Sequence, residues 1–134
     1  MTEQEYIDLF YLLWNHAENE VVEFKRAESN YDIDDLGKYF SALSNEANLR
    51  EHEFAWLVMG CWDKKHIIEG TSFKDSEESL NRLKQDMSQH TTDKLIFREI
   101  VPIHVEGKRV LMFKIPASPR NIVMHWKGIA YGRD

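Results

Sequence analysis

The chain of 134 residues is 43% hydrophobic and 30% charged, contains one cysteine and has a formal net charge of −6. This size and composition predict one domain with one hydrophobic core, and a single cysteine excludes an internal disulfide and favours a reducing compartment. The longest apolar run, Ala55 to Trp62, is far shorter than the roughly 20 residues of a membrane-spanning helix, and the N-terminus lacks the features of a signal peptide. We therefore predict a cytoplasmic protein with no membrane partner.

Two helices and a short strand are predicted in the first 50 residues. Thr2 and Glu5 have the spacing of a capping box, and the apolar residues that follow recur at helical intervals up to about Asn15. The alternating, β-branched stretch from Val21 to Lys25 indicates a strand. An acidic loop with N-cap candidates then precedes a second helix, which is marked by Leu36, Tyr39, Phe40, Leu43 and Ala47.

A central strand is predicted from Phe54 to Trp62, because this stretch is almost continuously apolar, as in a strand that is buried on both faces. The pair Ile67-Ile68 is expected to lie beside it. A third helix is expected to begin near Asp75, because Asp75 and Glu78 have the capping-box spacing. Its narrow apolar stripe consists of Leu80, Leu83 and Met87.

The remainder of the chain is predicted to be mainly strand. Leu95–Val105 and Arg109–Ile115 flank Glu106-Gly107, which suits a hairpin turn. Trp126 to Tyr131 is expected to form a last short strand. The order of elements predicts an α+β fold, a mixed β-sheet with about three helices packed on it.

Basic residues are concentrated near the C-terminus. Residues 1–93 contain 9 Lys and Arg and 20 Asp and Glu, whereas residues 94–134 contain 8 basic and 3 acidic residues. This asymmetry is typical of a domain with one basic face that contacts a polyanion; the alternative is that exposed strands and turns simply carry Lys and Arg. The candidate nucleic-acid-binding residues are Lys25, Arg109, Lys114, Lys127 and Arg133.

Three acidic residues form a candidate carboxylate cluster. Glu23 shares one face of its predicted strand with Lys25, Glu18 reaches that face only from the connection before the strand, and Asp63 ends the central strand. If the two strands are neighbours, Glu18, Glu23 and Asp63 converge. Oxygen ligands suit Mg²⁺ or Mn²⁺, the only cofactors that the sequence suggests, and such an ion can activate water for phosphodiester cleavage. Solvated surface acids are the alternative.

Other reaction classes lack their motifs. His16-Ala17-Glu18 has the H-x-E spacing of zinc deaminases, but the required P-C-x-x-C is missing. The sequence also contains neither G-x-G-x-x-G nor a Walker-type loop. These absences argue against zinc-dependent deamination and against nucleotide binding through those loops.

In a series of short motifs the chain resembles the Schlafen-type AlbA-like domain, over about residues 18–134. The motifs are Glu18-x4-Glu23-Phe24-Lys25, similar to E-x4-E-F-K, Ala42-Leu43-Ser44-Asn45, similar to A-F-A-N, Met59-Gly60-Cys61-Trp62-Asp63, similar to I-G-V-D-D, Gly107-Lys108-Arg109-Val110-Leu111, similar to G-K-x-V-L, and Lys127 to Arg133, similar to K-G-x-x-Y-x-R. Two departures stand out. Residues 46–53 replace a usual G-G, and Trp62 replaces the first aspartate of its motif. The first departure puts in doubt any backbone site that those glycines form.

The resemblance implies an AlbA/Schlafen-like fold and a nucleic-acid-binding domain of a bacterial transcriptional-regulator-like protein. We expect residues 1–134 to be one such domain, the N-terminal part of a chain with further C-terminal domains; a homodimer is left open. Some Schlafen relatives are metal-dependent RNases with acids at the positions of Glu18, Glu23 and Asp63, so the alternative is a divalent-metal-dependent endoribonuclease. A protein-interaction domain is the second alternative.

Overall fold

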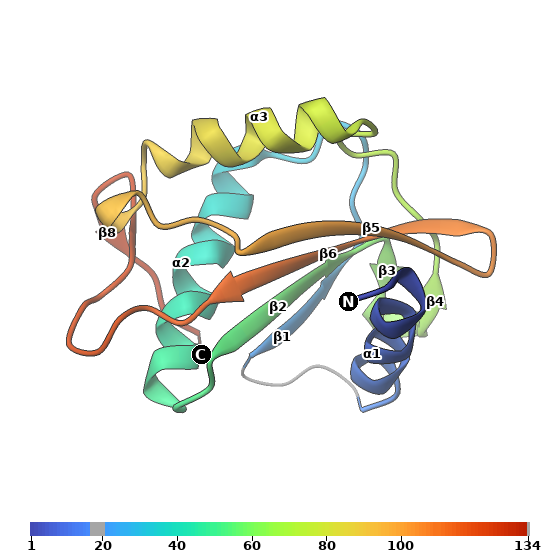
Figure 1. The fold of residues 1–134 in the computed structure, drawn as a ribbon, viewed down its shortest axis with the longest axis horizontal. Helices are drawn as coiled ribbons and strands as arrows, with labels where there is room; N and C mark the ends of the chain where they lie inside the picture. Colours follow the sequence, from blue (N-terminus) through green and yellow to red (C-terminus); the bar gives the residue numbers. More distant parts are fainter. Residues whose placement is uncertain (17–20, 134) are drawn as a thin grey trace.

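A four-stranded mixed sheet forms the centre of the computed structural model, which describes residues 1–16 and 21–133 (Figure 1). The helices are α1 (Glu3–Asn15), α2 (Ile33–Leu49) and α3 (Glu77–Ser88), with 3₁₀ turns at Asp63–Lys65 and Thr92–Lys94. The strands are β1 (Val22–Lys25), β2 (Phe54–Met59), β3 (Cys61–Trp62), β4 (Ile67–Ile68), β5 (Glu99–Val105), β6 (Lys108–Pro116), β7 (His125–Trp126) and β8 (Ile129–Ala130). The predicted α+β class is confirmed.

The main sheet has the order β1-β2-β6-β5. β1 runs parallel to β2, whereas β6 is antiparallel to both β2 and β5. Ala55, Leu57, Val58 and Met59 are fully buried, as expected for a strand with a neighbour on each side and side chains packed on both faces. The prediction that β2 is the central strand is therefore confirmed.

Helices α1 and α2 lie on opposite faces of the sheet. Successive β1 side chains point to opposite faces, and two neighbours on β1 contact different helices. Phe24 contacts Trp14 of α1 edge-on, with ring centroids 4.9 Å apart. Lys25, the next residue, lies over the ring of Tyr39 of α2, with its Nζ 4.6 Å from the ring centroid. This alternation directs Glu23 and Lys25 to the α2 side of the sheet.

Helix α2 is held by its cap and by a close contact with β7. Asp32 is the N-cap residue, and its side chain accepts a hydrogen bond from the backbone N–H of Asp34. Gly37 lies against the indole of Trp126, where an added Cβ atom would come within 2.1 Å of ring carbons. Glycine at this position therefore allows Trp126, which is 2% exposed, to pack directly on the helix.

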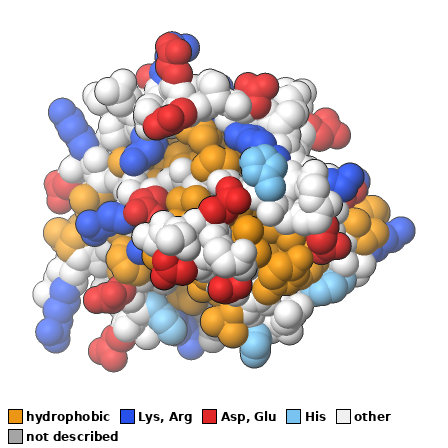
Figure 2. Space-filling view, turned by 45° about the vertical axis from the view of Figure 1, so that its right-hand side comes forward, with side chains coloured by type: hydrophobic (Ala, Val, Ile, Leu, Met, Phe, Trp, Pro, Cys, Tyr) orange, Lys and Arg blue, Asp and Glu red, His pale blue; other side chains and the backbone are white. Residues whose placement is uncertain are grey.

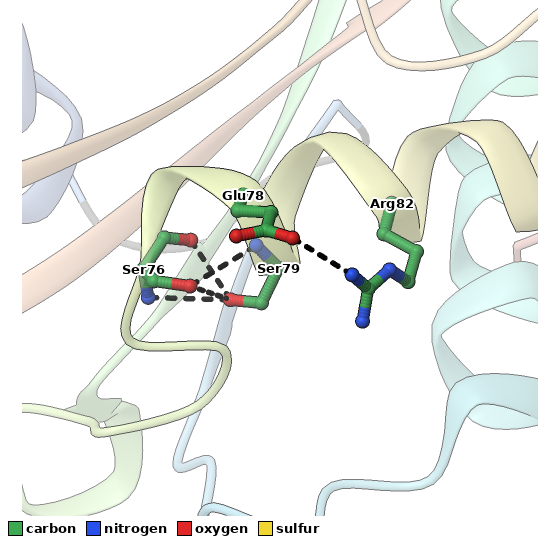
Figure 3. A network of polar contacts seen from close by, with 4 residues as sticks. All are labelled: Ser76, Glu78, Ser79 and Arg82. Carbon is green, nitrogen blue, oxygen red and sulfur yellow. Dashed lines mark hydrogen bonds and ion pairs between the residues drawn. The ribbon is translucent and has the colours of Figure 1, made fainter.

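Helix α3 begins one residue later than the sequence predicts. Ser76 is the N-cap residue, and its side chain and that of Ser79 form a reciprocal capping box (Figure 3). The predicted box of Asp75 and Glu78 is wrong, because Glu78 instead pairs with Arg82 one helical turn ahead, at 2.9 Å. The predicted apolar stripe is confirmed, since Leu80, Leu83 and Met87 are buried.

The connections between strands differ from the sequence prediction in three places. The predicted strand from Phe54 to Trp62 divides at Gly60, whose φ of 110° favours glycine, and β3 then pairs with β4. The predicted strand from Leu95 starts only at Glu99. The predicted last strand is instead a separate β7–β8 hairpin, because Lys127 and Gly128 both have positive φ and reverse the chain.

The hairpin between β5 and β6 is confirmed. Its turn residues, Glu106 and Gly107, have φ values of 51° and 74°, as in the type I′ turns that match the twist of two-residue hairpins. No helix within the described residues has the length and apolar character needed to cross a membrane.

Candidate nucleic-acid interface

A hollow of about 730 Å³ lies on the α2 side of β1. Its walls come from β1, the start of α2, the β3 segment and the chain near Tyr131. Five aromatic residues line it, Tyr31, Tyr39, Trp62, Tyr131 and Phe24, whose ring packs against Trp14 of α1. Four basic residues, Lys25, Arg26, Lys38 and Lys64, and three acidic residues, Glu23, Asp35 and Asp63, line it as well. Aromatic, basic and acidic side chains therefore share one concave surface.

The carboxylate of Glu23 is the most buried charged group in the hollow, in a residue that is 8% exposed. Lys25 Nζ lies 3.8 Å from one of its oxygens, and an Arg133 guanidinium nitrogen lies 3.4 Å from the other. A carboxylate removed from water is stable only with such partners. Glu23 therefore holds two cationic side chains at the wall of the hollow.

Trp62 forms the rim of the hollow together with basic side chains. The guanidinium carbon of Arg26 lies 3.8 Å from the centroid of the Trp62 ring, and Lys65 Nζ lies 4.8 Å from it. Arg26 also donates two hydrogen bonds to Glu69, at 2.7 and 3.1 Å. Stacking on Arg26 and the bidentate pair keep the half-buried indole in place beside the hollow.

The chain near Tyr131 is fixed to α2 by hydrogen bonds. The backbone N–H of Tyr131 donates to Ser41 Oγ at 3.1 Å, and its carbonyl accepts from Asn45 Nδ2 at 2.9 Å. Asn45 also bonds the backbone N–H and carbonyl of Met124. The serine and the asparagine of α2 thus hold the last aromatic wall of the hollow.

Tyr31 stays uncharged over the pH range in which proteins work. Burial is the main cause that raises the pKa of its phenol, and the neighbouring Tyr39 and Asp35 raise it further.

Two of the three predicted carboxylates line the same hollow. Glu23 and Asp63 are both in its wall, whereas Glu18 lies outside the described residues. Within residues 1–16 and 21–133, no group of three His, Cys, Asp or Glu residues is placed so that it could hold a metal ion. The three-carboxylate metal site therefore stays a prediction.

The five predicted basic residues are not brought together on one face. Lys25 and Arg133 lie at the hollow. Lys114 and Arg109 stand five residues apart on β6 and so point to opposite faces of the sheet. Lys127 pairs with Asp34, at 2.7 Å, at the start of α2. Acidic and basic side chains are also interleaved over the face drawn in Figure 2.

The guanidinium of Arg109 is used for hydrogen bonds within the fold. It donates hydrogen bonds to the backbone oxygens of Thr71, Phe73 and Lys74, at 3.0, 2.9 and 2.7 Å. Burial lowers the pKa of this guanidinium. These three bonds tie the segment before α3 to β6.

Sequence reasoning missed most of the residues that line the hollow. Lys38 and Tyr39 lie in the first half of α2, Tyr31 lies just before its N-cap, and all three reach the hollow only through the packing of α2 on β1. Arg26 directly follows β1, and alternation from Lys25 would have placed it on the opposite face; it lines the hollow because the strand ends at Lys25.

A family model described as Schlafen, AlbA_2 matches residues 18–134. No protein with a curated description matches the chain.

Two solved structures are similar in fold. One is the crystal structure of the DIP2311 protein from Corynebacterium diphtheriae, with a TM-score of 0.62 and 16% identity over 96% of this chain, which spans 25% of that one. The other is the solution NMR structure of the N-terminal domain of a RecG-related protein from Nitrosomonas europaea, with a TM-score of 0.61 and 20% identity over 100% of this chain and 89% of that one.

Proposed function

Because the chain belongs to the Schlafen AlbA_2 family, we propose that it is a nucleic-acid-binding domain whose contact surface is the hollow beside β1. The observation that carries this proposal is the lining of the hollow, where the rings of Tyr31, Tyr39, Trp62 and Tyr131 lie together with four basic side chains. The similar domain from Nitrosomonas europaea supports it, since that protein is named as related to the ATP-dependent DNA helicase RecG.

The basic side chains of the hollow supply the phosphate contacts. Lys38 and Lys64 are exposed, and Arg26 is exposed beside Trp62. Each phosphate that such a side chain neutralises releases a counterion, so affinity falls as salt rises. The overall charge of −6 opposes this attraction, so we expect weak binding that is steeply dependent on salt.

The aromatic side chains favour nucleic acid that presents unpaired bases. Tyr39, Trp62 and Tyr131 are half-buried and line the hollow. Stacking of a base on an aromatic ring contributes about 1–3 kcal/mol and requires a base that is free of its duplex stack. A concave surface with such rings is therefore better suited to a single strand than to the outside of a duplex.

A binding experiment tests this proposal. The affinities of labelled single-stranded DNA, single-stranded RNA and duplex DNA are measured by fluorescence anisotropy over a range of salt concentrations, with and without Mn²⁺. We expect Lys38→Gln and Lys64→Gln each to reduce the log–log salt slope by about 0.7 on a single strand. Arg82→Gln is the matched control, because Arg82 is exposed on α3 and far from the lining of the hollow.

The outcomes separate the remaining alternatives. Equal affinities for the two lysine variants and the control would reject the hollow as the contact surface. No affinity for any nucleic acid would instead favour a protein-interaction domain. The DNA and RNA arms decide between a regulator-like DNA-binding role and an RNA-binding role. Lys114 and Lys127 stay predicted contacts outside the hollow, whereas the predicted contact of Arg109 competes with its three bonds to backbone oxygens and needs a test of its own.

Divalent-metal-dependent RNA cleavage is the second candidate function, favoured by the presence of Glu23 and Asp63 in the same hollow. The fit of a metal to the described residues is incomplete, because Glu23 is already paired with Lys25 and Arg133. Cleavage of RNA in Mn²⁺ that is lost in Glu23→Gln and Asp63→Asn would support this function. Glu78→Gln on α3 is the control, and cleavage unaffected by all three substitutions would end it.

A further inference from the structure

A second group of aromatic and basic side chains lies on the other face of the sheet. It consists of Phe54, Trp56, Arg98 and Lys114, and we refer to it as the Phe54 patch. Lys114 Nζ lies 4.1 Å from the centroid of the Phe54 ring and 5.9 Å from that of Trp56. The guanidinium carbon of Arg98 lies 5.8 Å from the Phe54 ring. The Phe54 ring therefore has two cationic groups, those of Arg98 and Lys114, within 6 Å of its centroid.

The strand register separates the Phe54 patch from the hollow. Trp56 pairs with Val22 of β1 and with Lys114 of β6, so these three side chains share one face. Val22 alternates with Glu23, which faces the hollow. The patch and the hollow therefore lie on opposite faces of β1 and β2.

Helix α1 shares the face of the Phe54 patch and packs mainly toward the other end of the sheet, although its Tyr6 hydroxyl reaches Glu99, the β5 neighbour of Lys114. Tyr11 donates a hydrogen bond to Glu106 in the β5–β6 turn, and Trp14 contacts Phe24. In Figure 1, α1 lies beside β3, β4 and the β5–β6 turn, away from the start of β2. Phe54 and Trp56 stay only half-buried, and Arg98 is exposed.

The charges of the Phe54 patch are suited to an anionic partner. Among residues 1–16 and 21–133, no carboxylate forms an ion pair with Arg98 or Lys114. Glu99, the β5 neighbour of Lys114, accepts a hydrogen bond from the hydroxyl of Tyr6 instead. Two cations next to partly exposed rings are the combination that binds phosphates and stacked bases in single-strand-binding surfaces.

We propose that the Phe54 patch is a second contact surface for single-stranded nucleic acid. One nucleic-acid strand would occupy the hollow, pass around the edge strand β1 and reach the patch on the other face of the sheet. Residues two apart on a strand are separated by about 6.6 Å, roughly twice the 3.4 Å rise of stacked bases in one strand. The spacing therefore allows both rings to contact one strand, and stacking of a base on either ring requires a base that is free of its duplex stack. This inference rests on the proposed function, because the same nucleic-acid strand occupies both the hollow and the Phe54 patch.

Photocrosslinking tests the proposal directly on the whole chain. A single-stranded oligonucleotide of about 20 nucleotides that carries 5-iodouracil is irradiated in the complex, and the crosslinked peptides are identified by mass spectrometry; this length exceeds the roughly 4–16 nucleotides that one single-strand-binding fold covers. We expect crosslinks to Phe54 or Trp56 in addition to crosslinks to residues of the hollow.

Two substitutions provide an independent readout. Phe54→Leu removes the ring but keeps an apolar side chain, and we expect it to weaken binding of the long oligonucleotide about 5- to 100-fold. Lys114→Gln is expected to reduce the salt slope by about 0.7, whereas Arg82→Gln leaves affinity and slope unchanged. An oligonucleotide of roughly 4 nucleotides fills one surface only, so its binding to the hollow is expected to be the same in wild type and Lys114→Gln.

The outcomes distinguish this inference from the proposed function. Crosslinks confined to the hollow, with unchanged affinity in Lys114→Gln, would overturn the Phe54 patch and leave the hollow as the contact surface. No binding of either oligonucleotide would overturn both. The unfolding midpoint of each variant is measured first, and if Phe54→Leu is unfolded, the crosslinks and Lys114→Gln decide.

Discussion

Replacing Arg109 by lysine tests whether this residue serves the fold or contacts nucleic acid. Its guanidinium bonds three backbone oxygens, those of Thr71, Phe73 and Lys74. Lysine keeps the positive charge, but a single ammonium group cannot reproduce the planar set of donors that arginine presents. The substitution therefore removes the anchor of the segment before α3 without changing the net charge.

The size of the effect follows from the number of bonds and their partial exposure. A hydrogen bond to a charged group contributes about 1.5–3 kcal/mol, so three fully buried bonds would contribute about 4–9 kcal/mol. Arg109 is half-buried, and water replaces part of what is lost, so we expect Arg109→Lys to reduce the free energy of unfolding by about 2–4 kcal/mol. For 134 residues this lowers Tm by about 7–14 °C.

Urea denaturation and thermal unfolding followed by circular dichroism measure this change. Arg82→Lys is the control, because Arg82 is exposed and pairs only with Glu78 among the interactions described, so a change within about 0.5 kcal/mol is expected. Affinity for nucleic acid per folded molecule should stay the same in Arg109→Lys. A variant as stable as wild type that binds nucleic acid more weakly would refute this reasoning and favour Arg109 as a phosphate contact.

Three further predictions concern the core and the caps. Gly37→Ala brings a Cβ atom into the Trp126 ring, so we expect a loss of about 1–3 kcal/mol in the free energy of unfolding, measured with urea. Ser76→Ala removes the α3 cap and should lower the free energy of unfolding by about 1 kcal/mol, whereas Asp75→Ala should lower it much less. A larger loss in Asp75→Ala than in Ser76→Ala would show that Asp75 is the cap. Burial raises the pKa of the Cys61 thiol to about 12, so a disulfide reagent at pH 8 should react with it only after unfolding, and rapid reaction with the folded protein would contradict its burial.

Local sequence signals were sufficient for most of the fold. The capping box of Thr2 and Glu5 is present as predicted, because both partners lie within one helical turn and have no strong competitor. The long apolar run of β2 identifies the central strand for a similar reason, since a strand with neighbours on both sides has few positions that tolerate a polar side chain.

The error at the start of α3 arose because two local patterns competed. Asp75 with Glu78 and Ser76 with Ser79 both have capping spacing, and the pairing of Glu78 with Arg82 leaves the serines as the cap. Adjacent positions can often serve as a cap, so spacing alone does not select between them.

The candidate site was predictable only in its β1 part and at Asp63. Glu23 and Lys25 share a strand face, which alternation reveals, and both are in the wall of the hollow. Lys38 and Tyr39 reach the hollow through the packing of α2 across the sheet, which no local spacing encodes. Charge alone likewise could not distinguish exposed Lys38 from Arg109, whose donors are taken by backbone oxygens.

An NMR titration measures the central claim most directly. Backbone amide shifts of the ¹⁵N-labelled chain are followed as a short single-stranded oligonucleotide is added at low salt. The nucleic-acid-binding role of the hollow predicts that the largest shifts occur at its lining residues, among them Lys38, Tyr39, Trp62 and Lys64, and that added salt reverses them. Shifts that are absent, or that gather on α3 around Arg82 while these four residues stay unchanged, would contradict it.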